Sequence, residues 1–151
     1  MQKIFSEWIC TVKAAELWFH AAHHLTKGTG FSGDHVNLYG KIYLELQEEF
    51  DAVAERVLGL TNDETLLCPK HCLSMTLKLM DLYPSPINMA EHDIALTAHK
   101  IILDYCMWEN AFHAKLDELG MLTLGLDDLL SSNASKHESY AYLLQQRIKK
   151  Q

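Results

Sequence analysis

Two carboxylates and two histidines are the residues of this chain best suited to chemistry. Asp51 and Glu55 lie four positions apart in a long apolar-periodic stretch, and His23 and His35 precede them. On a helix, side chains at positions i and i+4 are neighbours, so the two carboxylates present oxygens to one point. Carboxylate with imidazole suits iron, zinc or manganese, which predicts a metal half-site that a second element completes.

Other residues form weaker candidate sites. His20 and His24 lie on the same helical face as the first of the two histidines, which makes them possible extra ligands. Cys68, His71 and Cys72 lie within five residues and could bind zinc or form a redox pair, but one short cluster supplies at most three ligands. For this segment we favour a loop with two buried thiols.

Composition limits the class of protein. A chain of 151 residues predicts one domain, 1–151, and a net charge of -7 disfavours binding to nucleic acid or to anionic lipid. The sequence contains no apolar run of the length that a membrane span needs and no signal-peptide pattern at its start, so we expect a cytoplasmic protein. In that compartment the four cysteines are most simply reduced thiols.

The hydrophobic pattern predicts an all-α fold. Apolar residues recur at helical spacing in four long segments, and glycines or prolines separate these segments. A short helix lies in the connection between the second and third long helices. This order is that of a ferritin-like four-helix bundle with one long crossover. The predicted helices span residues 3–26, 34–60, 73–80, 87–119 and 126–148.

Three patches of this sequence resemble the Dps family, the miniferritins that protect DNA in starved bacteria. The first runs from His23 through a glycine-rich turn to His35, and the second, Asp51-Ala-Val-Ala-Glu55-Arg56, matches the family's Asp-x-x-Ala-Glu-Arg signature. The third begins with Lys136-His137 near the end of the chain. The resemblance covers nearly the whole chain, although only the second patch is specific by itself.

The resemblance implies a ferroxidase site shared by two subunits of a hollow dodecamer. His23 and His35 of one subunit would face Asp51 and Glu55 of its two-fold mate. Iron would be the metal, with zinc as a possible substitute. Fe(II) would be oxidised there with peroxide or oxygen, and the ferric mineral would be stored inside the cage. Two further carboxylates, Asp127 and Asp128, open the last predicted helix, where acidic groups favour the helix dipole, and would lie near the three-fold pores.

An absence in the sequence favours this site over that of ordinary ferritin. The di-iron site inside a ferritin bundle uses Glu-x-x-His motifs, and none of the nine histidines has a glutamate three residues before it. Family members commonly place the second histidine one residue closer to the aspartate than His35 is to Asp51. Either His35 lies in the loop before the second helix, or that helix contains a π-bulge, for which Gly40 is a plausible place.

Two alternative functions follow from departures from the family pattern. One is a non-catalytic cage-forming or metal-binding protein with impaired ferroxidase activity. Two departures favour it: His35 is shifted by one residue, and His24 replaces the tryptophan that follows the first histidine in the family. The other is a DNA-compacting protein, which the charge of -7 disfavours. A lysine-rich terminal arm is missing, and Lys3, Lys149 and Lys150 are the cations near the ends of this sequence, so we do not expect direct DNA binding.

Overall fold

The structure is a computed structural model that describes residues 2–149, and the regular secondary structure of these residues is helical, with no strand among them. The all-α prediction is therefore confirmed, whereas the ferritin-like bundle stays a prediction. The chain divides into two compact units, Met1–Ile94 and Ala95–Gln151. None of the described helices has the length and apolarity needed to cross a membrane.

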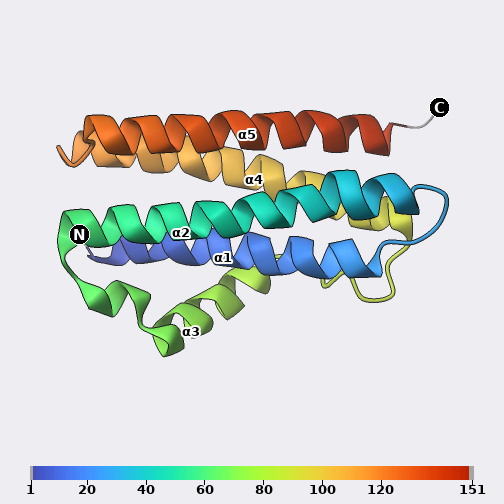
Figure 1. The fold of residues 1–151 in the computed structure, drawn as a ribbon, viewed down its shortest axis with the longest axis horizontal. Helices are drawn as coiled ribbons and strands as arrows, with labels where there is room; N and C mark the ends of the chain where they lie inside the picture. The colour runs from blue at the N-terminus through green and yellow to red at the C-terminus, as the bar shows by residue number, and fades with distance from the viewer. Residues whose placement is uncertain (1, 150–151) are drawn as a thin grey trace. The chain divides into compact units, whose positions relative to one another are not determined.

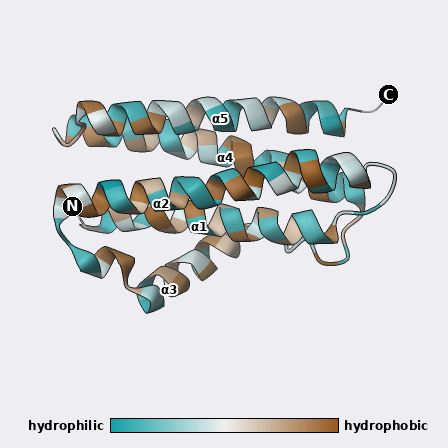
Figure 2. Ribbon diagram, viewed as in Figure 1, coloured by the Kyte–Doolittle hydropathy of each residue, from teal (hydrophilic) through white to brown (hydrophobic). Residues whose placement is uncertain are grey.

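The first unit is built on two antiparallel helices, α1 (Gln2–Leu25) and α2 (Lys41–Thr61), which lie side by side in Figure 1. A π-helical segment, Gly33–Gly40, leads directly into α2. The apolar stripes predicted for both helices form the core, with Trp8 and Phe19 of α1 and Ile42 and Leu46 of α2 fully buried. Hydrophobic and hydrophilic residues alternate in short stretches along both helices (Figure 2), and burial of the hydrophobic side chains stabilises the pair.

A short helix packs against α1 in the same unit. It follows a 3-10 turn, Glu64–Leu67, and runs as α3 from Pro69 to Met80. The prediction placed its start at Leu73 and assigned Cys68–Cys72 to a loop with two buried thiols, and this was wrong. Proline fits the first turn of a helix because that turn needs no N–H donor there, so α3 begins at Pro69 and Cys68 is exposed.

The second unit contains α5 (Leu124–Ile148) and most of α4 (Glu91–Glu118), which run antiparallel. The helix α4 begins four residues later than predicted, because Asn88 adopts a left-handed conformation (φ 62°) after Pro86. Thr123 caps α5, and its hydroxyl oxygen accepts a hydrogen bond from the Leu126 amide at 3.2 Å.

Candidate functional site

His23 of α1 and His35 of the π-helical segment hold each other in place. The Nδ1 of His23 lies 2.5 Å from the carbonyl oxygen of His35, and the Nδ1 of His35 lies 2.6 Å from the carbonyl oxygen of His23. Their rings stack with centroids 3.8 Å apart and an interplanar angle of 12°. A carbonyl oxygen only accepts, so each Nδ1 carries the proton and donates it. The lone pair of each ring is therefore on Nε2, where a metal ion binds.

His35 lies in the π-helical segment Gly33–Gly40. A π turn holds one residue more than an α turn, so this segment is an irregularity of the kind expected between His35 and Asp51. Of the two alternatives, the π-bulge is confirmed. Gly40 ends the segment with ordinary helical angles (φ -61°, ψ -45°), so its backbone conformation does not require glycine.

Space, and not conformation, requires glycine at position 40. A Cβ atom there would collide with the carbonyl oxygen of His35 and would lie 2.9 Å from the Nδ1 of His23. These are the atoms of one of the two reciprocal hydrogen bonds. Gly40 therefore allows the α2 backbone to approach the histidine pair closely.

Two more histidines and a tyrosine surround the pair. The ring of His20 stacks on Tyr43 of α2 at 4.4 Å, and the Nε2 atoms of His20 and His24 are 3.3 Å apart. Burial lowers the pKa of His23 below its ordinary value of 6.5, and positive charge on His35, His24 and His20 lowers it further. Lowering this pKa favours neutral imidazole, which is the form that coordinates a metal. The structure therefore brings together all four histidines predicted as ligands.

The predicted carboxylate ligands lie elsewhere in the same chain. Asp51 and Glu55 are exposed on α2. Tyr43, which contacts the histidines, precedes Asp51 by eight positions, an axial distance of about 12 Å. One chain therefore presents the histidines and the carboxylates at separate places. The prediction that a second subunit supplies the carboxylates stays a prediction.

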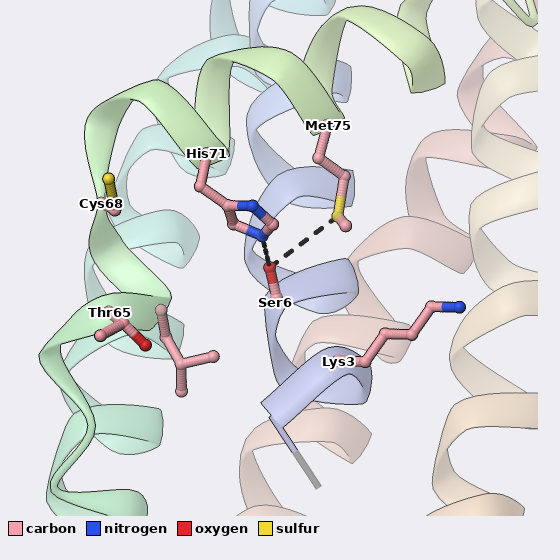
Figure 3. Close-up of a pocket in the computed structure, with 7 residues that line it drawn as sticks. Lys3, Ser6, Thr65, Cys68, His71 and Met75 are labelled. Carbon is pink, nitrogen blue, oxygen red and sulfur yellow. Dashed lines mark hydrogen bonds between the residues drawn. The ribbon is translucent and has the colours of Figure 1, made fainter.

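The side chains of Cys68, His71 and Cys72 turn to different neighbours. Figure 3 shows His71 pointing to Ser6 of α1, with its Nε2 2.7 Å from the serine oxygen. Cys72 instead lies against Cys10, with 3.7 Å between the two sulfurs. Cys68 and His71 line one pocket of about 370 Å³, and Cys72 lines another.

The two aspartates at the start of α5 differ in their surroundings. Asp127 lies 2.8 Å from the Nε2 of His113 on α4, so it pairs with a group in its own unit. Asp128 is exposed. Their predicted role at a pore between subunits stays a prediction.

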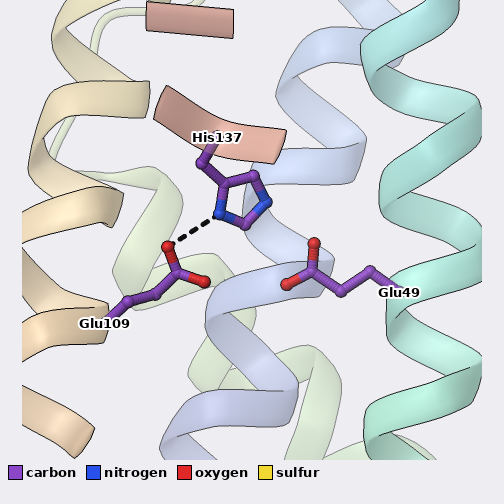
Figure 4. Close-up of side chains that lie close together, drawn as sticks. All are labelled: Glu49, Glu109 and His137. Carbon is purple, nitrogen blue, oxygen red and sulfur yellow. Dashed lines mark hydrogen bonds and ion pairs between the residues drawn. The ribbon is translucent and has the colours of Figure 1, made fainter. Parts of the chain in front are cut away.

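Sequence reasoning missed a buried glutamate–histidine pair in the second unit. Glu109 of α4 lies 2.8 Å from the Nδ1 of His137 on α5, and the two residues are 2% and 0% exposed (Figure 4). The ring of Tyr105 packs on His137 at 4.4 Å. A buried carboxylate beside an imidazole offers ligand types that could hold a metal ion.

A signal for these residues was present in the sequence. Polar residues occupy positions at which the helical period requires an apolar one. On α5 the buried positions follow one another at spacings of four and three residues, and two of the side chains in the middle are polar. The buried series on α5 is Leu126, Leu130, Asn133, His137, Tyr140 and Leu144.

Comparison of the chain with family models, with curated proteins and with solved structures gives no match.

Proposed function

We propose that this protein is a ferritin-like ferroxidase of the Dps type, in which two copies of the chain bind Fe(II) between them. His23 and His35 of one copy would bind the iron through their Nε2 atoms, and Asp51 and Glu55 of the other copy would supply the carboxylates. The observation that carries this proposal is the reciprocal pair of hydrogen bonds from each Nδ1 to the other residue's carbonyl oxygen.

This pair has the features of metal-ligating histidines in general. Such histidines usually donate the second ring N–H to a backbone carbonyl or a carboxylate, which fixes both the tautomer and the ring orientation. Here both rings are fixed in this way and are nearly parallel, with 12° between their planes. An imidazole and carboxylate set suits Fe(II), and an acidic chain with a net charge of -7 favours the accumulation of cations.

The exposure of Asp51 and Glu55 supports a site shared between copies. An i, i+4 carboxylate pair at the surface is slightly repulsive by itself, and a bound cation removes that repulsion. A two-fold interface uses the same surface on both partners, so each pair of copies would form two equivalent sites. A closed cage of such pairs, a dodecamer in our proposal, would enclose the ferric product.

The double variant Asp51→Ala/Glu55→Ala tests this proposal. We expect rapid oxidation of Fe(II) by peroxide or oxygen, followed by stopped-flow absorbance, to be lost, while light scattering shows the oligomer unchanged. Glu48→Ala removes another exposed carboxylate of α2 and serves as the matched control. Unchanged rates in the double variant would contradict the proposal.

Co-expression of two inactive variants tests whether the site is shared. In a mixed pair of one His23→Ala/His35→Ala copy and one Asp51→Ala/Glu55→Ala copy, one of the two sites regains all of its ligands. Random pairing would restore about a quarter of the wild-type sites. If all the ligands came from one copy, no activity would return.

A second candidate function is binding of a divalent metal ion inside the second unit, without oxidation of iron. The buried pair Glu109 and His137 favours it, because carboxylate and imidazole are metal-ligand types and both are held here away from water. The Nδ2 of Asn133 and the hydroxyl of Tyr140, both on α5, have no hydrogen-bond partner among residues 2–149. A pocket of about 180 Å³, lined by Glu109 and His113, provides access.

Calorimetric titration with Zn²⁺ separates the two functions. If the buried pair binds metal, Glu109→Gln removes one binding event and leaves the rate of Fe(II) oxidation unchanged. Equal zinc binding by Glu109→Gln and the wild type would exclude the buried site.

A further inference from the structure

Two thiols from different helices of the first unit lie within reach of each other. Cys10 is on α1 and is fully buried, and Cys72 is on α3 and is half-buried. Their sulfurs are 3.7 Å apart, and a disulfide requires about 2.05 Å. To form a disulfide, the two sulfurs therefore have to move closer by about 1.7 Å. The residues are far apart in the sequence, so only the packing of α3 on α1 brings the thiols together.

One of the two thiols, that of Cys72, lines a pocket of the first unit. Cys72 lines a largely apolar pocket of about 440 Å³, together with Lys13, Phe50 and Thr76. The ammonium of Lys13 lies 4.1 Å from the centre of the Phe50 ring and forms an ion pair with Glu16 of its own helix. Cys10 does not line it. A small oxidant that enters the pocket therefore meets Cys72 first, with Cys10 behind it.

Burial also separates the roles of the two thiols. Desolvation, and to a lesser extent the neighbouring Cys72, raise the pKa of Cys10 to about 12. Cys10 therefore stays a protonated thiol at neutral pH and is a poor first nucleophile. It is well placed for a second step, because its sulfur is already in contact with that of Cys72.

We infer that Cys72 and Cys10 form a peroxide-reactive thiol pair, in which Cys72 is oxidised first and Cys10 then closes a disulfide between α3 and α1. In the first step the Cys72 sulfur attacks hydrogen peroxide, the O–O bond breaks, and a sulfenic acid and one water form. In the second step the Cys10 sulfur displaces the sulfenic oxygen, which leaves as water with the Cys10 proton. Two thiols lose two electrons, and one peroxide becomes two waters.

The thiol pair does not depend on the proposed iron site. It uses no metal, and its residues are separate from His23, His35, Asp51 and Glu55. Its failure and the failure of the ferroxidase proposal can therefore be told apart when peroxide is added after removal of metal with a chelator.

Peptide mapping of the full-length wild-type protein tests the inference. After treatment with one equivalent of hydrogen peroxide and a chelator, we expect the intact mass to fall by about 2 Da. Two thiols should be lost to a thiol reagent and should return on reduction. Digestion after alkylation should give a linked peptide that joins Cys10 to Cys72.

Variants identify the role of each thiol. In Cys10→Ser the second step is impossible, so Cys72 should persist as a sulfenic acid that dimedone captures. Cys68→Ser and Cys106→Ser keep both proposed thiols and should cross-link as the wild type does. A linked peptide that joins Cys68 to Cys72, or a Cys72 that is fully alkylated after peroxide treatment, would overturn the inference. Mapping of the wild type decides this even if Cys10→Ser fails to fold.

Discussion

Replacing Gly40 with alanine is the sharpest test of how the histidine pair is held. The helical angles at this position suit alanine, so in open space the change would stabilise the helix by about 0.5 to 1 kcal/mol. At Gly40 the new methyl would instead collide with the His35 carbonyl oxygen and press on the His23 ring. Overpacking of this kind costs about 1 to 3 kcal/mol, and each lost hydrogen bond adds about 1 kcal/mol.

The opposing effects do not cancel. We expect Gly40→Ala to lower the free energy of unfolding by about 1 to 3 kcal/mol. Displacement of the carbonyl also frees the His23 ring to turn, so we expect metal affinity or the rate of Fe(II) oxidation to fall by about 10-fold to 100-fold. Urea unfolding measures the first effect, and stopped-flow absorbance measures the second.

Gly59 of α2 provides the matched control. A Cβ atom at Gly59 would meet nothing within 4 Å, so Gly59→Ala should raise stability by about 0.5 to 1 kcal/mol and leave iron oxidation unchanged. If Gly40→Ala behaves like Gly59→Ala in both assays, then close approach of the backbone does not hold the pair, and the reasoning is refuted.

Three further outcomes are expected. The pKa of His23 is lowered in the folded state, so the unfolded chain binds this proton more readily. The free energy of unfolding should therefore fall as the pH drops below about 6.5. Urea titrations at several pH values should show that this free energy depends less steeply on pH in His23→Asn. Closure of the Cys10–Cys72 disulfide should stabilise the protein by about 2 to 4 kcal/mol, which unfolding of the oxidised and reduced forms would show. Duplex DNA should not be retarded in a gel at about 150 mM salt, because a net charge of -7 opposes binding to phosphates. Of the three lysines named near the ends of the sequence, Lys3 and Lys149 are exposed and Lys150 lies outside the described residues. Retardation that persists after chelation would contradict this.

Local sequence determined the helices of this protein. Apolar residues at helical spacing marked the core faces of α1 and α2, and Gly28 and Gly120, which both adopt positive φ, marked the ends of α1 and α4. The resemblance to the Dps family, and not the hydrophobic pattern, predicted an irregularity near Gly40, and the π-helical segment is found there. These features depend on neighbours along the chain, so a reading of the chain in order can find them.

Contacts between distant residues were decided by tertiary structure. The sequence indicated that His23 and His35 belong together, but the exchange of hydrogen bonds with each other's carbonyls depends on how α1 packs beside α2. Cys72 was expected to be a buried thiol in a loop, but it lies on α3 and faces Cys10, and this contact depends on how α3 packs against α1.

The buried pair Glu109 and His137 likewise combines a feature that the sequence predicts with one that only the tertiary structure decides. Helical spacing alone places both residues at core positions, so their burial could have been predicted. Their 2.8 Å contact could not, because it depends on the register between α4 and α5. Sequence periodicity specifies which face of a helix is buried. The partner that each buried side chain meets is specified only when whole helices pack, because the packing of the helices minimises exposed apolar surface and unpaired polar groups over the entire interface.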